Sequence, residues 1–272
     1  MTYTETWRDY ERRDGSTAGA QIKVWHGLYS PQLDNLRDIL VCLPPTYGAS
    51  RKRYPVLYMH DGQNLFDATT SYAGEWRADK TLAALSREGT ESILVGIPNM
   101  GTERFNEYAP FYDPDYGGGR GDRYLDFVTE TLKPLIDRSF RTRVGREYTG
   151  LLGSSMGGLI SLYGFFRHPG VFGFAGAMSP AFWFADGAMF PLVDAAPYVG
   201  GKLYIDVGDD EYPDDARKTA VYLSGAAKMR RLLRDKGYSD ERLRYRVEEG
   251  GRHHESAWAR RFPGALRFFV RG

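Results

Sequence analysis

The sequence predicts an α/β fold: a mostly parallel central sheet with an antiparallel N-terminal strand pair and helices on both faces. Three observations lead to this fold class. Short β-rich runs alternate with amphipathic helical runs from about residue 21 onward. The first two β-rich runs lie close together, which is typical of an antiparallel pair. No Gly/Ser-rich or Pro-rich linker and no internal repeat divides the 272 residues, so we expect one domain over 1–272, with 1–19 as an N-terminal extension.

The first half of the chain supplies the strand pair and the start of the parallel sheet. The runs QIKVWHGLYS (21–30) and LRDILVCLPP (36–45) form the pair, and YPVLYMHDG (54–62) is a buried strand that ends in a polar turn. TLAALSREG (81–89) predicts a short helix, and ESILVGIPN (91–99) predicts the next strand. The segment 122–140 has helical spacing of its apolar residues, which are Tyr124, Phe127, Val128, Leu132, Leu135 and Ile136.

The second half repeats the strand–helix alternation. Strands are predicted at 148–154, 172–180, 202–210 and 243–249, and helices at 156–170, 216–237 and 255–270. Gly237 ends the long helix, as glycine often does. The glycine cluster at 115–124 lacks the Gly-Lys-Ser/Thr of a phosphate-binding loop, so it is interpreted as a mobile surface turn.

Composition and charge exclude several classes of protein. The formal net charge is +1, which gives no sign of a nucleic-acid partner. The one cysteine, Cys42, lies in an apolar run and is interpreted as a buried strand thiol. No apolar stretch is long enough to span a membrane, and the polar N-terminus lacks the core of a signal peptide. We expect a cytoplasmic protein, although a secreted chain whose signal has been removed would look the same.

Ligands of such sheets bind outside the carboxyl ends of the strands, so the polar residues that follow each strand are the candidates for a site. They are His60 to Asn64, Asn99, Ser155, Ser179 with Pro180, Gly208 to Glu211, and His253 to Glu255. Although far apart in sequence, they fall on one edge of the predicted sheet.

Ser155 lies at G-x-S-x-G spacing between Gly153 and Gly157, and between a predicted strand and a predicted helix. That is the context of a nucleophile elbow, in which a strained backbone presents the serine hydroxyl above the sheet and the glycines avoid collisions. The alternative is a glycine-rich turn with an incidental serine. Ser154 stands one residue too early for the motif.

A serine nucleophile needs a base, and this fold class orders its triad as serine, acid, histidine. His253 and His254 follow the last strand and are the base candidates. The acid should follow the strand KLYIDV, where GDDEYPDD offers the carboxylates Asp209, Asp210, Glu211, Asp214 and Asp215. A solvated acidic loop and a metal site are the alternatives. The spacing is not that of a calcium loop, so no metal and no organic cofactor are expected.

Several segments taken together resemble the esterase D-like and enterochelin esterase-like family of α/β-hydrolases. They are LRDILVCLPPTY, RYPVLYMHDGQNLFD, IPNMGTERFNEYAP, LLGSSMGG, AMSPAFWF, LYIDVGDDE and GGRHHESAW. The resemblance extends from about residue 21 to 269 and implies an α/β-hydrolase fold without a large lid domain. The family includes enterochelin, feruloyl and acetyl-xylan esterases, S-formylglutathione hydrolases and mycolyltransferases.

The resemblance implies a role for each matching residue. Ser155 matches the nucleophile, and His253, five residues before Trp258, matches the base. Glu211, three residues after Gly208, matches the acid, with Asp209 and Asp210 as alternatives. The oxyanion hole requires two backbone N–H donors, one from Met156 and one from Gly62 or Gln63. The expected pocket residues are Asp61, Asn64, Asn99, Arg104, Glu107 and Trp183, although an internal ion pair is an equal alternative for Arg104 and Glu107.

These features predict a serine carboxylic-ester hydrolase that acts through an acyl-enzyme on short-acyl, aryl, sugar or siderophore-type esters. The expected partner is a small-molecule ester, with neither nucleic acid nor membrane. Two alternatives remain open: an acyltransferase that uses the same triad, and a non-catalytic domain that binds a carbohydrate or siderophore.

Overall fold

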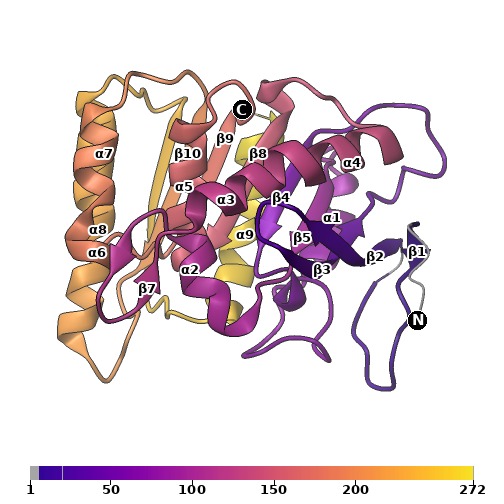
Figure 1. The fold of residues 1–272 in the computed structure, drawn as a ribbon, viewed down its shortest axis with the longest axis horizontal. Coiled ribbons are helices and arrows are strands. Elements are labelled where there is room, and N and C mark those ends of the chain that lie inside the picture. The colour runs from indigo at the N-terminus through magenta and orange to yellow at the C-terminus, as the bar shows by residue number, and fades with distance from the viewer. Residues whose placement is uncertain (1–5, 20, 272) are drawn as a thin grey trace.

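The computed structural model describes residues 6–19 and 21–271, and confirms the predicted α/β fold (Figure 1). Its main sheet has nine strands in the order β1-β2-β3-β5-β4-β8-β9-β10-β11. The bounds are β1 Arg8–Asp9, β2 Ile22–Ser30, β3 Asn35–Cys42, β4 Val56–His60, β5 Ile93–Ile97, β8 Thr149–Ser154, β9 Phe174–Met178, β10 Lys202–Gly208 and β11 Leu243–Glu248. The strands from β5 to β11 pair in parallel, whereas β2 and β3 form the antiparallel pair that the sequence predicts.

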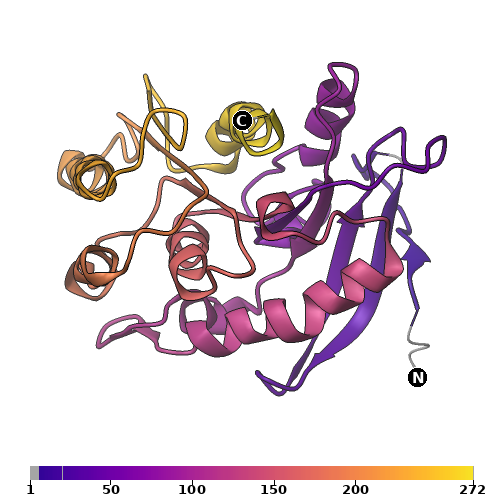
Figure 2. The ribbon, with the colours of Figure 1, turned by 90° about the horizontal axis from the view of Figure 1, so that it is seen from above.

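The helices lie on both faces of this sheet. They are α1 Ala78–Ser86, α2 Arg104–Tyr108, α3 Gly121–Asp126, α4 Lys133–Ser139, α5 Met156–Arg167, α6 Phe184–Gly187, α7 Met189–Ala195, α8 Ala216–Asp235 and α9 Glu255–Arg271. A π-helical turn, Phe127–Leu132, joins α3 to α4, so the helix predicted over 122–140 is one continuous segment. Figure 2 shows α1 and α9 on one side of the sheet, with α5, α8 and the α3–α4 segment on the other.

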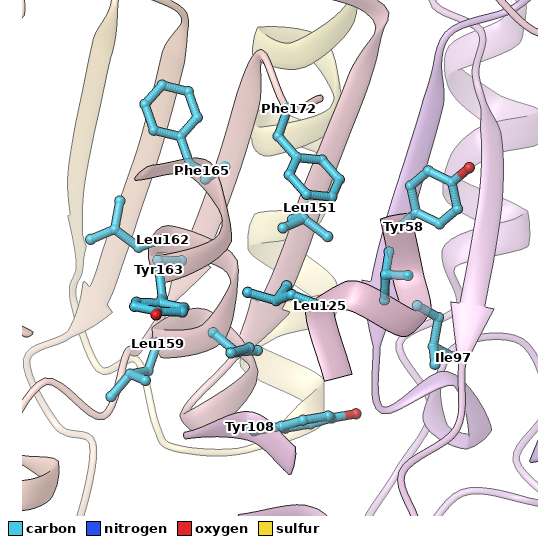
Figure 3. Packing of buried hydrophobic residues seen from close by; sticks show 14 of the residues in the cluster. Tyr58, Ile97, Tyr108, Leu125, Leu151, Leu159, Leu162, Tyr163, Phe165 and Phe172 are labelled. Atoms are coloured by element: carbon cyan, nitrogen blue, oxygen red, sulfur yellow. The ribbon is translucent and has the colours of Figure 1, made fainter. Parts of the chain in front are cut away.

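Alternation along each strand divides the core between the two faces. In β4, Val56 and Tyr58 belong to the cluster under α5 and α8, whereas Leu57 and Met59 belong to the cluster under α1 and α9. Both sets are buried because helices cover both faces. Figure 3 shows Leu159, Leu162 and other α5 side chains in the same packed layer as Leu151 of β8.

One segment differs from the sequence interpretation. The glycine cluster forms a hairpin rather than a simple turn, because β7 Gly117–Gly118 pairs with β6 Tyr112–Asp113. The last helix runs through Pro263, as the predicted helix over 255–270 requires. Among the described residues, no helix is both long enough and apolar enough to cross a bilayer.

Candidate active site

Ser155 occupies a strained turn between β8 and α5. Its backbone has φ 55° and ψ −120°, a conformation that L-residues rarely adopt and that concentrates at functional sites. Hydrogen bonds hold this conformation: the Ser155 N–H donates to the Met178 carbonyl at 2.9 Å, and the Ser155 carbonyl accepts from Ala181 N–H at 3.1 Å. The strain is therefore held by β9 and by the turn that follows it, and Ser155 is partly exposed at the head of α5.

The two motif glycines are required by close backbone approach. A Cβ placed on Gly153 would lie 2.8 Å from the carbonyl carbon of Gly157. A Cβ on Gly157 would lie 3.2 Å from His60 Cβ, since the buried His60 packs beneath the turn. His60 Nδ1 is 2.8 Å from the Tyr124 hydroxyl, so this histidine supports the turn from below rather than facing the cavity.

The predicted oxyanion donors lie at the start of α5 and in the turn after β4. The N–H groups of Met156 and Gln63 have no acceptor within residues 6–19 and 21–271. For Met156 this is expected, because the first N–H groups of a helix have no intrahelical partner. Gly62 has a packing role: a Cβ there would lie 2.5 Å from the Ile97 nitrogen, so only glycine lets this turn sit against β5.

The loops that follow β10 and β11 are joined by backbone hydrogen bonds. Asp209 N–H donates to the Glu248 carbonyl at 3.1 Å, and His253 N–H donates to the Glu211 carbonyl at 2.9 Å. Gly208 allows the approach, since a Cβ on it would lie 1.9 Å from the Gly251 carbonyl oxygen. The loop geometry brings the His253 Nδ1 to 2.7 Å from Glu211 Oε2.

Of the three carboxylates considered for the acid, only Glu211 contacts His253. Asp209 accepts instead from Gly250 N–H at 2.7 Å, and Asp210 lies 3.6 Å from Arg252 near the surface. His254 is exposed and contacts Ser256. Because a carboxylate only accepts hydrogen bonds, His253 Nδ1 carries the proton and its Nε2 keeps a free lone pair, as a general base requires.

A buried network fixes the Glu211 carboxylate from behind. Its Oε1 accepts from Ser179 Oγ at 2.5 Å and from Gly208 N–H at 2.6 Å. Ser179 Oγ itself accepts from Trp258 Nε1 at 3.0 Å and from Arg261 Nη2 at 2.9 Å. Both of those groups are donors only, so the Ser179 proton must point at Glu211. Burial would raise the pKa of Glu211, but the bonds from His253, Ser179 and Gly208 lower it, and the carboxylate stays anionic.

A cavity of about 410 Å³ opens at Ser155 and Met156. Most of its walls are aromatic, and Trp183 is among them; the other lining residues are Phe105, Tyr116, Tyr212, Lys218, Val221 and Tyr222. Tyr116 comes from the glycine hairpin, so a segment interpreted as a mobile turn contributes to the cavity wall. Phe182, next to Trp183, is only 1% exposed and belongs to the core.

A second polar cluster lies beside the elbow. Asp61 receives two bonds from Arg104, at 2.7 and 2.8 Å, and one from Asn99 at 2.7 Å. Burial would raise the pKa of Asp61, but the Arg104 charge and these hydrogen bonds lower it. The carboxylate reaches the elbow, since Asp61 Oδ2 lies 3.6 Å from the Cβ position of Gly157.

Of the six expected pocket residues, only Trp183 lines the cavity described above; Asp61, Asn99 and Arg104 form the cluster beside the elbow, and Glu107 and Asn64 lie elsewhere. Glu107 is 1% exposed and pairs with the buried Arg37 of β3 at 2.6 Å, so the ion-pair alternative describes it and the pocket assignment is corrected. Asn64 is also buried; it accepts from Tyr72 N–H and donates to Glu255 at 3.4 Å. Glu107 and Asn64 point into the protein interior because each contacts a charged partner from a distant segment, Arg37 and Glu255 respectively.

Known proteins resemble this chain in sequence and in fold. A sequence model of the family described as "Putative esterase" matches residues 30–269. The uncharacterized protein YbbA of Bacillus subtilis is 25% identical over 236 residues, which are 85% of this chain and 91% of YbbA. The endo-1,4-beta-xylanase/feruloyl esterase of Xylanibacter ruminicola is 24% identical over 88% of this chain, and the match spans 30% of that longer protein.

Among solved structures, the siderophore hydrolase EstB of Aspergillus nidulans superposes with a TM-score of 0.73. The alignment covers 93% of this chain and 96% of EstB, at 18% sequence identity. At that identity the likeness shows a common fold.

Proposed function

This chain belongs to the "Putative esterase" family, and from that premise and the site geometry we propose that it is a serine ester hydrolase that works through an acyl-enzyme. The observation that supports this most directly is the strained Ser155 at the head of α5, in a site that also holds a His253–Glu211 pair at 2.7 Å. Tyr222 links the two parts, since it lines the Ser155 cavity and its ring lies 4.7 Å from the His253 ring.

In the proposed reaction, His253 Nε2 takes the Ser155 proton while Ser155 Oγ bonds to the ester carbonyl carbon. The negative charge on the carbonyl oxygen is held by the N–H groups of Met156 and Gln63. The C–O bond to the alcohol then breaks, and the alcohol leaves with the proton from His253. Water repeats the sequence, with His253 as base, and the carboxylic acid leaves. Glu211 stays ionised throughout and balances the imidazolium.

The substrate that the cavity suits best is a small ester with an aromatic group next to the scissile bond. About 410 Å³ accommodates one ring with a short chain, and aromatic walls favour stacked or edge-on contacts with it. The single cation among the lining residues, Lys218, lies 3.8 Å from the centre of the Tyr212 ring.

The test is hydrolysis of p-nitrophenyl esters, acetyl through octanoyl, by wild type and Ser155→Ala. Loss of the nucleophile should lower kcat by about a thousandfold or more. Ser154→Ala is the matched control, because it removes a buried hydroxyl one residue before the turn and should leave kcat unchanged. A fluorophosphonate should label Ser155 in wild type.

Three outcomes would contradict the proposal in different ways. Equal activity in wild type and Ser155→Ala would exclude Ser155 as the nucleophile. Absence of both activity and label would indicate a binding protein. If an added alcohol collected the acyl group faster than water did, the chain would be an acyltransferase.

A further inference from the structure

Tyr222 occupies a central place in the site although nothing in the sequence marks it. It lies on α8, is 3% exposed, and lines the same cavity as Ser155. In the sequence it is one of several apolar positions on a long amphipathic helix. Its position beside the nucleophile becomes visible only when α8 packs on the sheet next to β10.

Three aromatic rings surround the His253 imidazole. Tyr212 is stacked on it with ring centroids 5.1 Å apart, Trp258 meets it edge-on at 5.1 Å, and Tyr222 is the closest at 4.7 Å. Tyr222 therefore stands on the side of the serine where the histidine and its acid lie. The oxyanion donors Met156 and Gln63 come from other elements, the start of α5 and the turn after β4.

Tyr222 shares the cavity with several polar side chains. Burial raises the pKa of Tyr222, and the side chains of Trp183, Tyr212 and Ser155 offset this only in part. All three of these residues line the cavity, and Ser155 is the proposed nucleophile. The hydroxyl thus keeps its proton at neutral pH and can donate it in a hydrogen bond to a group bound in the cavity that Ser155 also lines.

We propose that Tyr222 is a catalytic residue of this site, and that its hydroxyl donates a hydrogen bond to the leaving-group oxygen of the ester. The inference rests on the proposed function. When the tetrahedral intermediate collapses, the C–O bond to the alcohol breaks, and His253 Nε2–H gives its proton to that oxygen. Tyr222 keeps its own proton and stabilises the charge that develops before the transfer. In deacylation the attacking water takes the place of the alcohol, and the same hydroxyl orients it.

A donor at the leaving group matters more when the leaving alcohol is a stronger base. p-Nitrophenolate disperses its own charge, whereas an alkoxide does not. A hydrogen bond to a charged partner is stronger than one between neutral groups. We therefore expect Tyr222→Phe to lower kcat/KM about threefold on p-nitrophenyl acetate and about thirtyfold on benzyl acetate.

The experiment measures kcat/KM for p-nitrophenyl, phenyl and benzyl acetate with wild type and three variants. Tyr222→Phe keeps the ring against His253 and removes only the hydroxyl. Tyr222→Leu also removes the ring and should slow all three esters further. Tyr238→Phe is the matched control, since it removes a buried hydroxyl that donates to the Val199 carbonyl, outside the cavity.

A loss that grows from p-nitrophenyl to benzyl acetate in Tyr222→Phe, and not in Tyr238→Phe, would support the proposal. An equal loss on all three esters, or none, would overturn it while leaving the serine hydrolase intact. If wild type hydrolysed none of the esters and Ser155 took no fluorophosphonate label, the proposed function and this inference would both be wrong.

Discussion

Replacing Glu211 by glutamine should do more damage than the loss of one charge suggests, because the surroundings dictate which way the amide turns. On one side of the carboxylate, Oε1 accepts from two donors, Ser179 Oγ and Gly208 N–H. On the other, Oε2 faces only His253 Nδ1. An amide NH₂ placed on the first side would face two donors, so it must turn toward His253.

The magnitude follows from this choice. Turning the NH₂ the other way would leave two buried donors without acceptors, at about 1–3 kcal/mol each. With the NH₂ facing His253, Nδ1 becomes an acceptor and the proton moves to Nε2, which can then no longer take the Ser155 proton. Returning the proton to His253 Nδ1 requires the amide to turn back, which thus costs about 2–6 kcal/mol. We expect kcat to fall by about 30- to 2 × 10⁴-fold, and loss of the correct tautomer in other triads lies in the upper part of that range.

The assay is p-nitrophenyl acetate hydrolysis from pH 6 to 9, together with thermal unfolding to confirm that the variant is folded. Asp209→Asn and Asp210→Asn are matched controls, because each neutralises a neighbouring carboxylate that does not contact His253. Both should stay within about threefold of wild type, since exposed charges are worth little. A Glu211→Gln enzyme within tenfold of wild type, or an Asp210→Asn enzyme as slow as Glu211→Gln, would refute the reasoning.

Two further predictions concern stability. Glu107→Ala leaves the buried Arg37 without its ion-pair partner and should lower the free energy of unfolding by about 3–5 kcal/mol. The KM of the folded enzyme should not change. A raised KM at unchanged stability would mean that Glu107 belongs to the pocket. Burial lowers the pKa of His60 to about 3. Between pH 3 and about pH 6.5 the unfolded chain therefore binds a proton at this residue that the folded chain does not, so the free energy of unfolding decreases as the pH falls. From pH 7 to pH 5 this contributes about 2 kcal/mol, and urea titrations of His60→Asn should show a pH dependence weaker by that amount; equal pH dependence in both proteins would contradict it.

The sequence predicts the strands, the long helices and the position of Ser155 because these depend on local pattern. Alternation and helical spacing identify the elements, and a glycine-flanked serine between a strand and a helix identifies the turn. The choice among Asp209, Asp210 and Glu211 is not local. It depends on backbone bonds between the loops after β10 and β11, which bring residues 42 positions apart into contact.

Other parts of the site depend on partners that are far away in the sequence, and the sequence analysis did not predict them. Glu107 faces Arg37, which is 70 residues away in β3, and nothing near either residue indicates the pair. Arg261 did leave a signal. It lies on the same helical face as Ala257, Trp258 and Phe262, all buried, and an arginine in that register requires buried acceptors. Tyr222 left none, since an aromatic residue on the apolar face of a helix is ordinary core composition.

Arg261 lies among buried carboxylates whose pKa values shift in opposite directions. Its fully buried guanidinium lies 3.3 Å from Asp206, 3.9 Å from Glu211 and 3.6 Å from Glu248, so one cation serves three acids. Burial raises the pKa of Asp206 to about 6, and neither of its oxygens has a hydrogen-bond partner within the described chain. Glu211 lies in the same cluster, but the donors Ser179, Gly208 and His253 lower its pKa. Proximity to the cation is common to both, so the three donors account for the lower pKa of Glu211. The Ser179 hydroxyl, oriented by Trp258 and Arg261, thereby helps to keep the negative charge on the residue that His253 contacts.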